Sequence, residues 1–591
     1  MKKTIFLVFL FFQFSSAQQV PQKWLTDYEK SGYKRTPRYA ETMEYCRRLE
    51  KGSPWIKVTS FGKSPEGRDL SLVIASKEGA FGPTKAAKTE KAIVLIQNGI
   101  HAGEIDGKDA CLMLLRDIAI TKTQASLLEG VILLVIPMYN VDGHERFGPY
   151  NRINQNGPEE TGWRVTAQNL NLNRDYLKAD APETQAWLKM FNAWLPDFFI
   201  DCHVTDGADF QYSITYAIET HQNVAPSVRT WTNTKLLHPV LAKVQAAGIK
   251  IAPYLFFVDE RDKLKGLLGY VSPPRFATGY AVLQNRPGFL VETHMLKEYA
   301  TRVDATYRVL QAILETINAD PQSLRRAVRI ADEQSKHGPE TPFPVQFEMT
   351  DEPSDTLHLL GYEQRIERSE VSGADRIVYT REPFEADIPR YDEAKVTKSI
   401  VPPQAYLIPP QWSQVIGRLK SHGLRLERLT ASQELEIESY RFSNVKWQQT
   451  PFEGRHPVTY SIELTEERRL FPAGTVVVRL HQRAARVAIH ALEPDAPDAF
   501  VQWGFFDPIF EQKEYAEDYV MESVAREMLA NDPDLKKEIA ARLSTDSAFA
   551  KNPSARLNFF YQHSPYWDTQ INLYPVSRLM SDIPLATEPI Q

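Results

Sequence analysis

Four short, nearly uninterrupted apolar segments constrain the fold of this chain more than any other feature. They cover residues 92–100, 131–138, 198–202 and 289–291, and helical patterns lie between them. Strands that are apolar on both faces are typical of sheets covered by helices on both sides. The sequence therefore predicts an α/β domain with a mixed or parallel sheet, preceded by a helix at 36–52 and a hairpin formed by 55–60 and 70–75.

Length and charge narrow the class further. The chain has 591 residues, too many for one ordinary domain, and its 69 basic and 75 acidic side chains give a net charge of -6. This balance provides no electrostatic basis for binding nucleic acid. With only three cysteines, Cys46, Cys111 and Cys202, no disulfide framework holds the fold, and a pair between Cys46 and Cys111 is left open.

The first seventeen residues have the pattern of a secretory signal. Lys2 and Lys3 precede an apolar run at 5–12, and small residues at 15–17 suit cleavage after Ala17. The run is too short for a membrane-spanning helix, which needs about 20 apolar residues. We therefore expect a protein exported to the periplasm or the extracellular space, without a stable membrane anchor.

A change in composition near residues 335–345 divides the rest of the chain. Residues 339–410 contain ten prolines and little helical periodicity. Beyond them, strands are expected at 458–464, 475–480 and 486–492, followed by helices at 514–529 and 534–543. We predict a catalytic domain over 18–338 and an accessory region over 339–591 that is first β-rich and then helical.

The best chemical signal is the pair His101 and Glu104, which offers an imidazole and a carboxylate three residues apart. The same spacing occurs at His337/Glu340 and His490/Glu493, so the pattern alone is weak. Only His101 directly follows a buried strand, and open α/β sheets bind ligands at the carboxyl ends of their strands. His337 lies in a Gly-Pro linker, and His490 is expected inside an alternating strand, where residues three apart face opposite sides.

Further candidates follow other strand ends. His203 comes after the run 198–202 and is the expected third metal ligand, with Asp201 placed to orient it. Glu292 ends the run 289–291 and could serve as general base; the alternative is a carboxylate that emerges into solvent. Arg174, which follows Asn173, could bind a substrate carboxylate through two hydrogen bonds; the alternative is a structural salt bridge.

Together these residues resemble the zinc carboxypeptidase family, the carboxypeptidase A-like metallopeptidases, over residues 55–299. The matching segments, in family order, are 62–68, His101 to Glu104, 140–143, 172–174, 182–184, His203 and Glu292. The resemblance implies a mixed, mostly parallel eight-stranded sheet with flanking helices. It also implies one zinc ion held by His101, Glu104 and His203, with Glu292 as general base and acid for the water that zinc activates.

Other roles are implied by position in the family pattern. Asn173 and Arg174 would hold the terminal carboxylate of a peptide substrate. Arg164 would stabilise the oxyanion, with Arg152 as its rival. Tyr270 would cap the substrate, with Tyr280 as its rival, and the residue at the base of the specificity pocket cannot be placed.

One departure concerns Asn171. The family often has Asp at this position, where it is thought to hold a ligand histidine, so support for the ligand is expected from elsewhere.

Three functions are compatible with these motifs. The first is an exported carboxypeptidase that acts on peptides with a free C-terminus. The second is a zinc-dependent amide hydrolase of N-acyl amino acids or cell-wall peptides, favoured by Asp201-Cys202-His203. The third is a binding protein that keeps the fold without turnover. Nothing in the sequence identifies a site in the accessory region or an oligomeric state.

Overall fold

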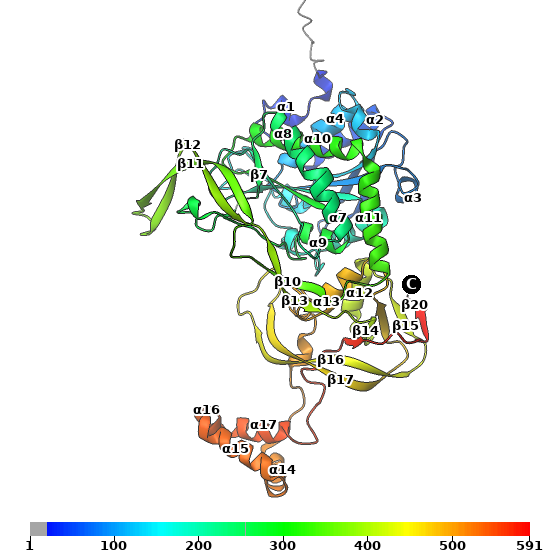
Figure 1. Ribbon diagram of the computed structural model, residues 1–591, viewed down its shortest axis with the longest axis vertical. Coiled ribbons are helices and arrows are strands. Elements are labelled where there is room, and N and C mark those ends of the chain that lie inside the picture. Colours follow the sequence, from blue (N-terminus) through cyan, green and yellow to red (C-terminus); the bar gives the residue numbers. More distant parts are fainter. Residues whose placement is uncertain (1–19, 255, 591) are drawn as a thin grey trace, which may run out of the picture.

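A computed structural model describes residues 20–254 and 256–590 (Figure 1). The predicted signal segment, residues 1–17, lies outside the described residues. In the described part of the chain, none of the helices combines the length and the apolar composition needed to cross a lipid bilayer.

The N-terminal half is built on a mixed eight-stranded sheet, which confirms the predicted fold class. The strand order is β1-β2-β4-β3-β5-β9-β6-β7. Strands β4, β3, β5 and β9 run parallel, whereas β1, β2 and β6 each pair with an antiparallel neighbour. The strands are β1 (Ile56–Lys63), β2 (Asp69–Ala75), β3 (Ala92–Asn98), β4 (Val131–Ile136), β5 (Phe198–Thr205), β6 (Ile214–Ile218), β7 (Ile251–Pro253) and β9 (Gly288–His294).

The helices of this half cover both faces of the sheet. They are α1 (Asp27–Lys30), α2 (Tyr39–Gly52), α3 (Pro83–Ala86), α4 (Asp106–Ala119), α5 (Val141–Glu145), α6 (Pro182–Trp194), α7 (Pro226–Trp231), α8 (Leu237–Ala246), α9 (Ala277–Leu283), α10 (Tyr299–Ala319) and α11 (Pro321–Lys336). Successive side chains of a strand point to opposite faces. Accordingly, Val94 and Ile96 of β3 pack with α2, α4, α10 and α11, whereas Ile93 and Leu95 pack with α6 and α9.

The second of these cores continues into the accessory region. Its members include Trp187 of α6 and Tyr280 of α9, together with Tyr406, Val478 and Ile489 of the accessory region. The two parts of the chain therefore share one apolar core rather than meeting at a polar boundary.

The accessory region contains three groups of strands. A seven-stranded sheet has the order β17-β16-β19-β14-β18-β15-β20, and β10 pairs with β13. The long hairpin β11–β12 projects from the body and is joined to the N-terminal half through β8 (Figure 1). These strands are β8 (Leu267–Leu268), β10 (Phe343–Met349), β11 (Asp355–Arg368), β12 (Asp375–Tyr391), β13 (Ala394–Ile400), β14 (Ala405–Ile408), β15 (Glu427–Leu429), β16 (Gln433–Trp447), β17 (Val458–Phe471), β18 (Val476–Arg479), β19 (Ser577–Leu579) and β20 (Thr587–Pro589).

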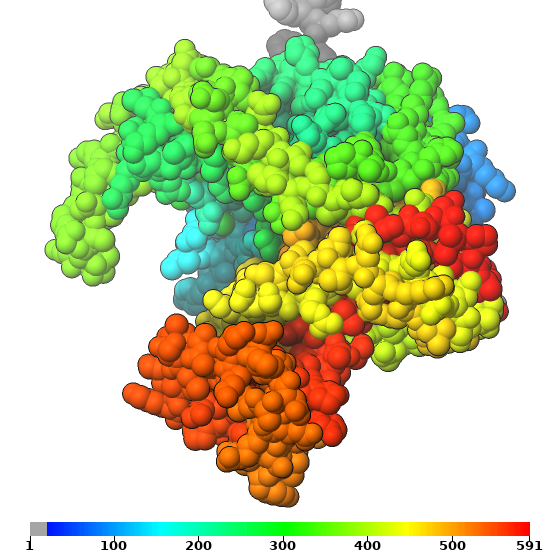
Figure 2. Space-filling view, turned by 60° about the horizontal axis from the view of Figure 1, so that its bottom comes forward, coloured from blue at the N-terminus to red at the C-terminus, as the bar shows by residue number. Residues whose placement is uncertain are grey.

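Two helices, α12 (Ser413–Ser421) and α13 (Ala485–Leu492), pack between this sheet and the N-terminal half, and four more form a separate module. The module consists of α14 (Asp518–Asn531), α15 (Pro533–Thr545), α16 (Ser547–Ala550) and α17 (Pro553–Gln562), which overlap the two helices expected near 514–543. It has its own small core, to which Met521, Ile539 and Phe559 contribute. In Figure 1 the module stands away from the rest of the molecule, and in Figure 2, where the bottom is turned forward, it forms the orange lobe at the lower end.

The structure decides two expectations from the sequence, one about residues 486–492 and one about the cysteines. The strand expected at 486–492 is wrong, because these residues form helix α13. Every residue of α13 is buried, so its apolar pattern carries no trace of a solvent-facing side and imitates alternation. The three cysteines are all free and buried, so Cys46 and Cys111 do not form a disulfide.

Candidate metal centre and substrate cavity

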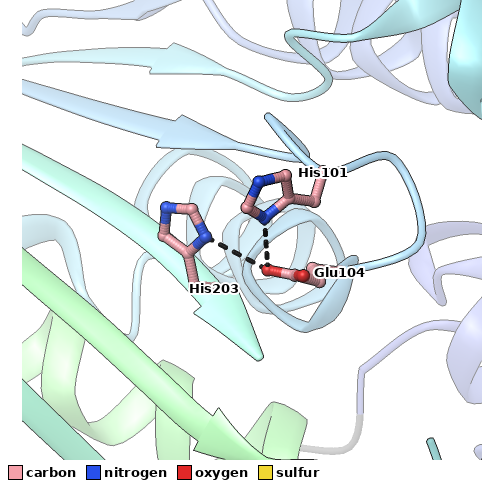
Figure 3. A group of neighbouring side chains, drawn as sticks. All are labelled: His101, Glu104 and His203. Carbon is pink, nitrogen blue, oxygen red and sulfur yellow. Dashed lines mark hydrogen bonds and ion pairs between the residues drawn. The ribbon is translucent and has the colours of Figure 1, made fainter. Parts of the chain in front are cut away.

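The parallel pair β3 and β5 brings the candidate ligands together. Asn98, the last residue of β3, lies opposite Cys202 in the register of β5. His101 and Glu104 follow in the turn between β3 and α4, and His203 is the next residue of β5. All three side chains are buried and point toward one another (Figure 3).

The ligand atoms of these residues converge on one point. One atom from each of His101, Glu104 and His203 lies within 4.8 Å of the others. Nδ1 of His101 and Nδ1 of His203 are each 3.1 Å from Oε2 of Glu104. In the described part of the chain, this is the one group of three or more such side chains arranged to hold a metal ion.

Each histidine is oriented by a second side chain. Nε2 of His203 lies 2.8 Å from Oδ2 of Asp201, as predicted, and Nε2 of His101 lies 3.1 Å from Oδ1 of Asn171. Both partners are oxygen acceptors, so each Nε2 carries the proton and each Nδ1 offers a lone pair. The expectation that support for His101 would come from elsewhere is therefore wrong, because the amide oxygen of Asn171 takes that role.

This arrangement fits a bound cation. Two imidazole lone pairs and a carboxylate oxygen face one another, and Nδ1 of His101 is buried without a hydrogen-bond partner. Burial lowers the pKa of His101 to about 4, which keeps the ring neutral. Although burial opposes it, the charge of Asp201 raises the pKa of His203 well above its ordinary value, so without a metal ion a proton lies between His203 and Glu104, and a bound cation would take the place of that proton. Two nitrogen ligands and one carboxylate oxygen suit zinc and leave one coordination position for water or substrate.

Three donors fix the carboxylate of Glu104. Arg152 and Arg164 donate to Oε1 at 3.0 and 3.2 Å, and the backbone N–H of Val204 donates to Oε2 at 3.1 Å. The two arginines differ in exposure: the side chain of Arg152 is 9% exposed and that of Arg164 is 42% exposed. Arg164 lines the substrate cavity, whereas Arg152 is not among the residues that line it. Of the two rivals, only Arg164 is therefore placed to meet a substrate.

Glu292 lies beside the metal ligands. It is opposite His203 in the parallel register of β5 and β9, and it lines the same cavity. Its Oε2 atom is buried without a hydrogen-bond partner. Burial raises the pKa of Glu292 to about 8, and the charges of Glu104 and Asp201 add to the rise against the opposing charges of His203 and Arg164. The carboxyl group is thus placed to exchange a proton with a molecule bound at the metal centre.

Arg174 and Asn173 form a second polar group in the cavity. The guanidinium of Arg174 lies 4.1 Å above the ring of Phe276 and donates to the backbone oxygen of Asn173 at 2.8 Å. Within residues 20–254 and 256–590, no carboxylate forms an ion pair with Arg174. Oδ1 of Asn173 accepts the N–H of Ala277 at 3.2 Å, which leaves its side-chain NH2 group to donate to a ligand.

The tyrosines in this region have different environments. Tyr280 is fully buried, and its hydroxyl lies 2.8 Å from Nδ1 of His422, so it cannot cap a ligand in the cavity. Tyr270 is 50% exposed and lines the cavity. Tyr254, which the sequence did not indicate, lines it too, with its hydroxyl 2.9 Å from Oγ1 of Thr205. No local pattern distinguished Tyr254 from the other 24 tyrosines of the chain.

The cavity has a volume of about 890 Å³ and extends from the metal ligands to the accessory region. Arg390 and Asp392, at the end of β12, form part of its wall. Glu453 of the accessory region accepts the backbone N–H of Asn171 at 3.2 Å. Sequence reasoning found no site in residues 339–591, because nothing in a local pattern indicates that these residues reach a cavity in the other half.

The competing histidine pairs do not form metal sites. His337 follows the last residue of α11. His490 lies on α13, where its Nε2 is 2.9 Å from the amide nitrogen of Asn223. Glu493 accepts hydrogen bonds from Tyr406, Tyr440 and Arg578. The prediction that His490 lies in a strand is wrong, but its imidazole and the Glu493 carboxylate have separate partners.

Comparison with known proteins identifies the same family as the motifs. The zinc carboxypeptidase family model matches residues 42–224. Carboxypeptidase 2 of Trichophyton rubrum is 24% identical over 490 residues, covering 79% of this chain and 84% of the relative. Carboxypeptidase 2 of Trichophyton tonsurans is 25% identical over 492 residues, with the same coverage.

The comparison with solved structures gives matches to carboxypeptidases. A metallo-carboxypeptidase from Burkholderia cenocepacia aligns with a TM-score of 0.36 and 17% identity, covering 48% of this chain and 69% of the other. Carboxypeptidase A from Helicoverpa armigera aligns with a TM-score of 0.34 and 17% identity, covering 50% of this chain and 75% of the other.

Proposed function

We propose, from the premise that this chain belongs to the zinc carboxypeptidase family, that it hydrolyses the C-terminal peptide bond of exported or extracellular peptides. The observation that carries this proposal is Arg174. It is a partly buried cation in the same cavity as the metal ligands, and no carboxylate in the described part of the chain pairs with it. Burial lowers its pKa, and the nearby Arg164 lowers it further.

A peptide carboxylate is the natural partner for such a group. An arginine binds a carboxylate through two parallel hydrogen bonds, and the free NH2 group of Asn173 can donate a third. A peptide anchored in this way by its last residue would place its final amide bond toward the metal ligands and Glu292. Selection of the chain end therefore follows from the position of Arg174 relative to the metal centre.

The remaining cavity groups have roles in proton transfer and charge stabilisation. A zinc ion held by His101, Glu104 and His203 supplies a Lewis acid, which polarises a carbonyl and lowers the pKa of water toward about 7. Glu292 takes a proton from the attacking water and passes it to the leaving amine. Arg164 lies beside the ligands, and its exposed guanidinium meets the negative charge that develops on the carbonyl oxygen.

The location of the enzyme is a separate part of the proposal. Only the N-terminal pattern, Lys2 and Lys3 followed by an apolar run and small residues, supports export. N-terminal sequencing of the protein collected outside the cytoplasm should give Gln18 as the first residue. Recovery of the chain from the cytoplasm with Met1 in place would contradict this part alone.

The central prediction concerns Glu292→Gln. This change removes the proton acceptor and leaves the three metal ligands untouched, so kcat should fall by about 10²- to 10⁴-fold while the zinc content stays at one per chain. The measurement is release of the last amino acid from a peptide library, followed by mass spectrometry, with metal analysis of each protein. Glu90→Gln serves as the matched control, because Glu90 is an exposed carboxylate outside the cavity.

The substrates distinguish the remaining functions. Peptides with an amidated C-terminus should be poor substrates, because they have no charge for Arg174. An amide hydrolase of N-acyl amino acids would instead release acetate or succinate from acylated amino acids and leave unblocked peptides intact. Near wild-type turnover by Glu292→Gln would remove the assignment of the base, and binding without turnover by the wild type would favour a binding protein.

A further inference from the structure

One end of the substrate cavity is acidic. Glu292 and Leu290 lie on one face of β9, and their antiparallel partners on β6 are Thr215 and Ala217. Strand β6 ends at Ile218, and the next residue, Glu219, lines the same cavity as Glu292. Glu219 is four positions after Thr215, the partner of Glu292, so at about 3.3 Å per residue it lies ~13 Å from the level of Glu292.

Glu219 has spare capacity to bind a ligand. Its side chain is 9% exposed; Oε1 accepts the N–H of Ser272 at 3.3 Å, and Oε2 lies 3.3 Å from Nε2 of His221. An ionised carboxylate accepts about four hydrogen bonds, so two positions remain. Ala217, Leu290 and Glu219 all line the cavity, which provides an apolar path from the metal centre to the carboxylate.

Asp392, from the accessory region, lines the same cavity. Its Oδ2 lies 3.0 Å from Nη1 of Arg390, but Arg390 is also bound by Asp355 through its Nε atom at 2.7 Å. The group formed by Asp355, Arg390 and Asp392 therefore carries one net negative charge. The side chain of Asp392 is 45% exposed, and its partial loss of water raises its pKa, with the charges of Asp355 and Glu219 adding to the effect against the opposing influence of Arg390.

Charged groups of both signs line the cavity beyond the metal ligands and Glu292. Arg164 lies beside Glu104 and its charge acts on Arg174, whereas the charges of Glu219 and Asp392 act on each other. A terminal lysine or arginine has the complementary arrangement, with a carboxylate and a cation joined by an aliphatic stem that packs well on apolar walls.

We propose that Glu219, together with Asp392 of the accessory region, selects peptides whose last residue is lysine or arginine. The inference rests on the proposed carboxypeptidase function and adds the substrate class. It also assigns the accessory region a part in specificity, since Asp392 reaches the cavity from β12.

The test compares peptides that differ only in the last residue: lysine, arginine, norleucine, leucine and glutamate. Norleucine has nearly the same stem as lysine but no charge. The zinc-loaded wild type should cleave the lysine and arginine peptides with a kcat/KM about 10- to 100-fold above norleucine. Equal values for lysine and norleucine would overturn the proposal.

Two variants test which side chains cause the preference for a terminal lysine. Glu219→Gln can still accept the Ser272 N–H, and it should reduce kcat/KM for lysine about 10- to 100-fold while leaving norleucine unchanged. Asp392→Asn should act in the same direction with a smaller loss. Glu393→Gln is the matched control, since Glu393 is exposed and absent from the cavity wall. A parallel loss for lysine and norleucine in Glu219→Gln would show a structural role and contradict the proposal.

Binding measurements distinguish a failure of the proposed peptidase activity from a failure of the proposed selection for lysine and arginine. If no peptide is cleaved, the dissociation constants of the same peptides, measured by calorimetry on the zinc-loaded wild type, still report selection. A lysine peptide that binds about tenfold more tightly than the norleucine peptide would support the acidic end of the cavity even without turnover. Equal binding would overturn it.

Discussion

His101 depends on a neutral amide for its orientation. Oδ1 of Asn171 lies 3.1 Å from Nε2 of His101 and also accepts the backbone N–H of Asn173 at 3.0 Å. The same side chain therefore holds a metal ligand and shapes the turn that carries Asn173 and Arg174. An amide oxygen without a formal charge raises the basicity of the imidazole less than a carboxylate would.

This contact gives a prediction for zinc affinity. Asn171→Ala should weaken zinc binding about 10- to 100-fold, because the ligand loses its orienting partner. Asn171→Asp should bind zinc at least as tightly as the wild type. Competition titration against a chromophoric chelator measures both without any need for activity.

Gln168→Ala, an exposed change in the same segment, should leave zinc affinity unaltered and serves as the control. An unchanged affinity in Asn171→Ala would show that the hydrogen bond does not support the ligand.

At the scale of elements, α9 and α12 meet through a buried histidine. His422, directly after α12, accepts the Tyr280 hydroxyl at Nδ1 over 2.8 Å and donates from Nε2 to the backbone oxygen of Leu177 over 2.8 Å. The bond at Nδ1 requires the neutral ring, because both ring nitrogens of a protonated imidazole are donors. Burial, aided by the charge of Arg418, lowers the pKa of His422 to about 4 against the opposing effect of the bond to Leu177. The contact between the two halves of the molecule is therefore sensitive to acid.

The shifted pKa of His422 determines how the free energy of unfolding changes with pH. The folded-state pKa lies below the ordinary value of about 6.5, so the unfolded chain binds the proton more readily between pH 4 and pH 6.5. The contribution of His422 is complete above pH 6.5 and is lost as the pH falls toward 4, by on the order of 3 kcal/mol.

His422→Gln cannot titrate in this range and tests the sign. It should be less stable than the wild type at pH 7, and the two unfolding midpoints should converge as the pH falls. Denaturant unfolding at several pH values measures the difference, which cancels the contributions of the other buried histidines. A constant difference between pH 4 and pH 7 would contradict this account.

At the scale of the whole molecule, the accessory sheet and the module α14–α17 differ in how they connect to the rest of the protein. The core that contains Trp187 and Tyr280 continues into the accessory sheet and α13, so cutting the chain near residue 338 would expose an apolar face. The module α14–α17 instead encloses its own core. Its ends return to one place, because the N–H of Asn572 donates to the backbone oxygen of Ile509 at 2.9 Å.

Two deletions should therefore have opposite results. Replacing residues 513–568 by a short Gly/Ser linker should leave kcat/KM within about twofold and the main unfolding midpoint within about 2 °C, as for changes confined to the surface. A chain that ends at residue 338 should bind a hydrophobic dye and aggregate. Peptide cleavage and thermal unfolding measure both. A stable, active 18–338 fragment would contradict the shared core.

The features that could be predicted from the sequence alone are those that local residue patterns encode. The buried strands, the eight-stranded sheet implied by the family motifs and the ligands His101, Glu104 and His203 were all predicted, because strand burial and ligand spacing are written in adjacent residues. Glu292, Asn173 and Arg174 were located too, and the structure places them in one cavity with the ligands.

Only the tertiary structure decided the rest. Residues 486–492 form a helix, and Tyr280 is buried beside His422. Asn171 orients His101, and Asp392 of the accessory region lines the same cavity as Glu219. Each of these outcomes depends on partners far away in the chain. The sign of a charge or the apolar pattern of a segment cannot reveal such a partner, because burial and electrostatic pairing are set by packing and not by sequence neighbours.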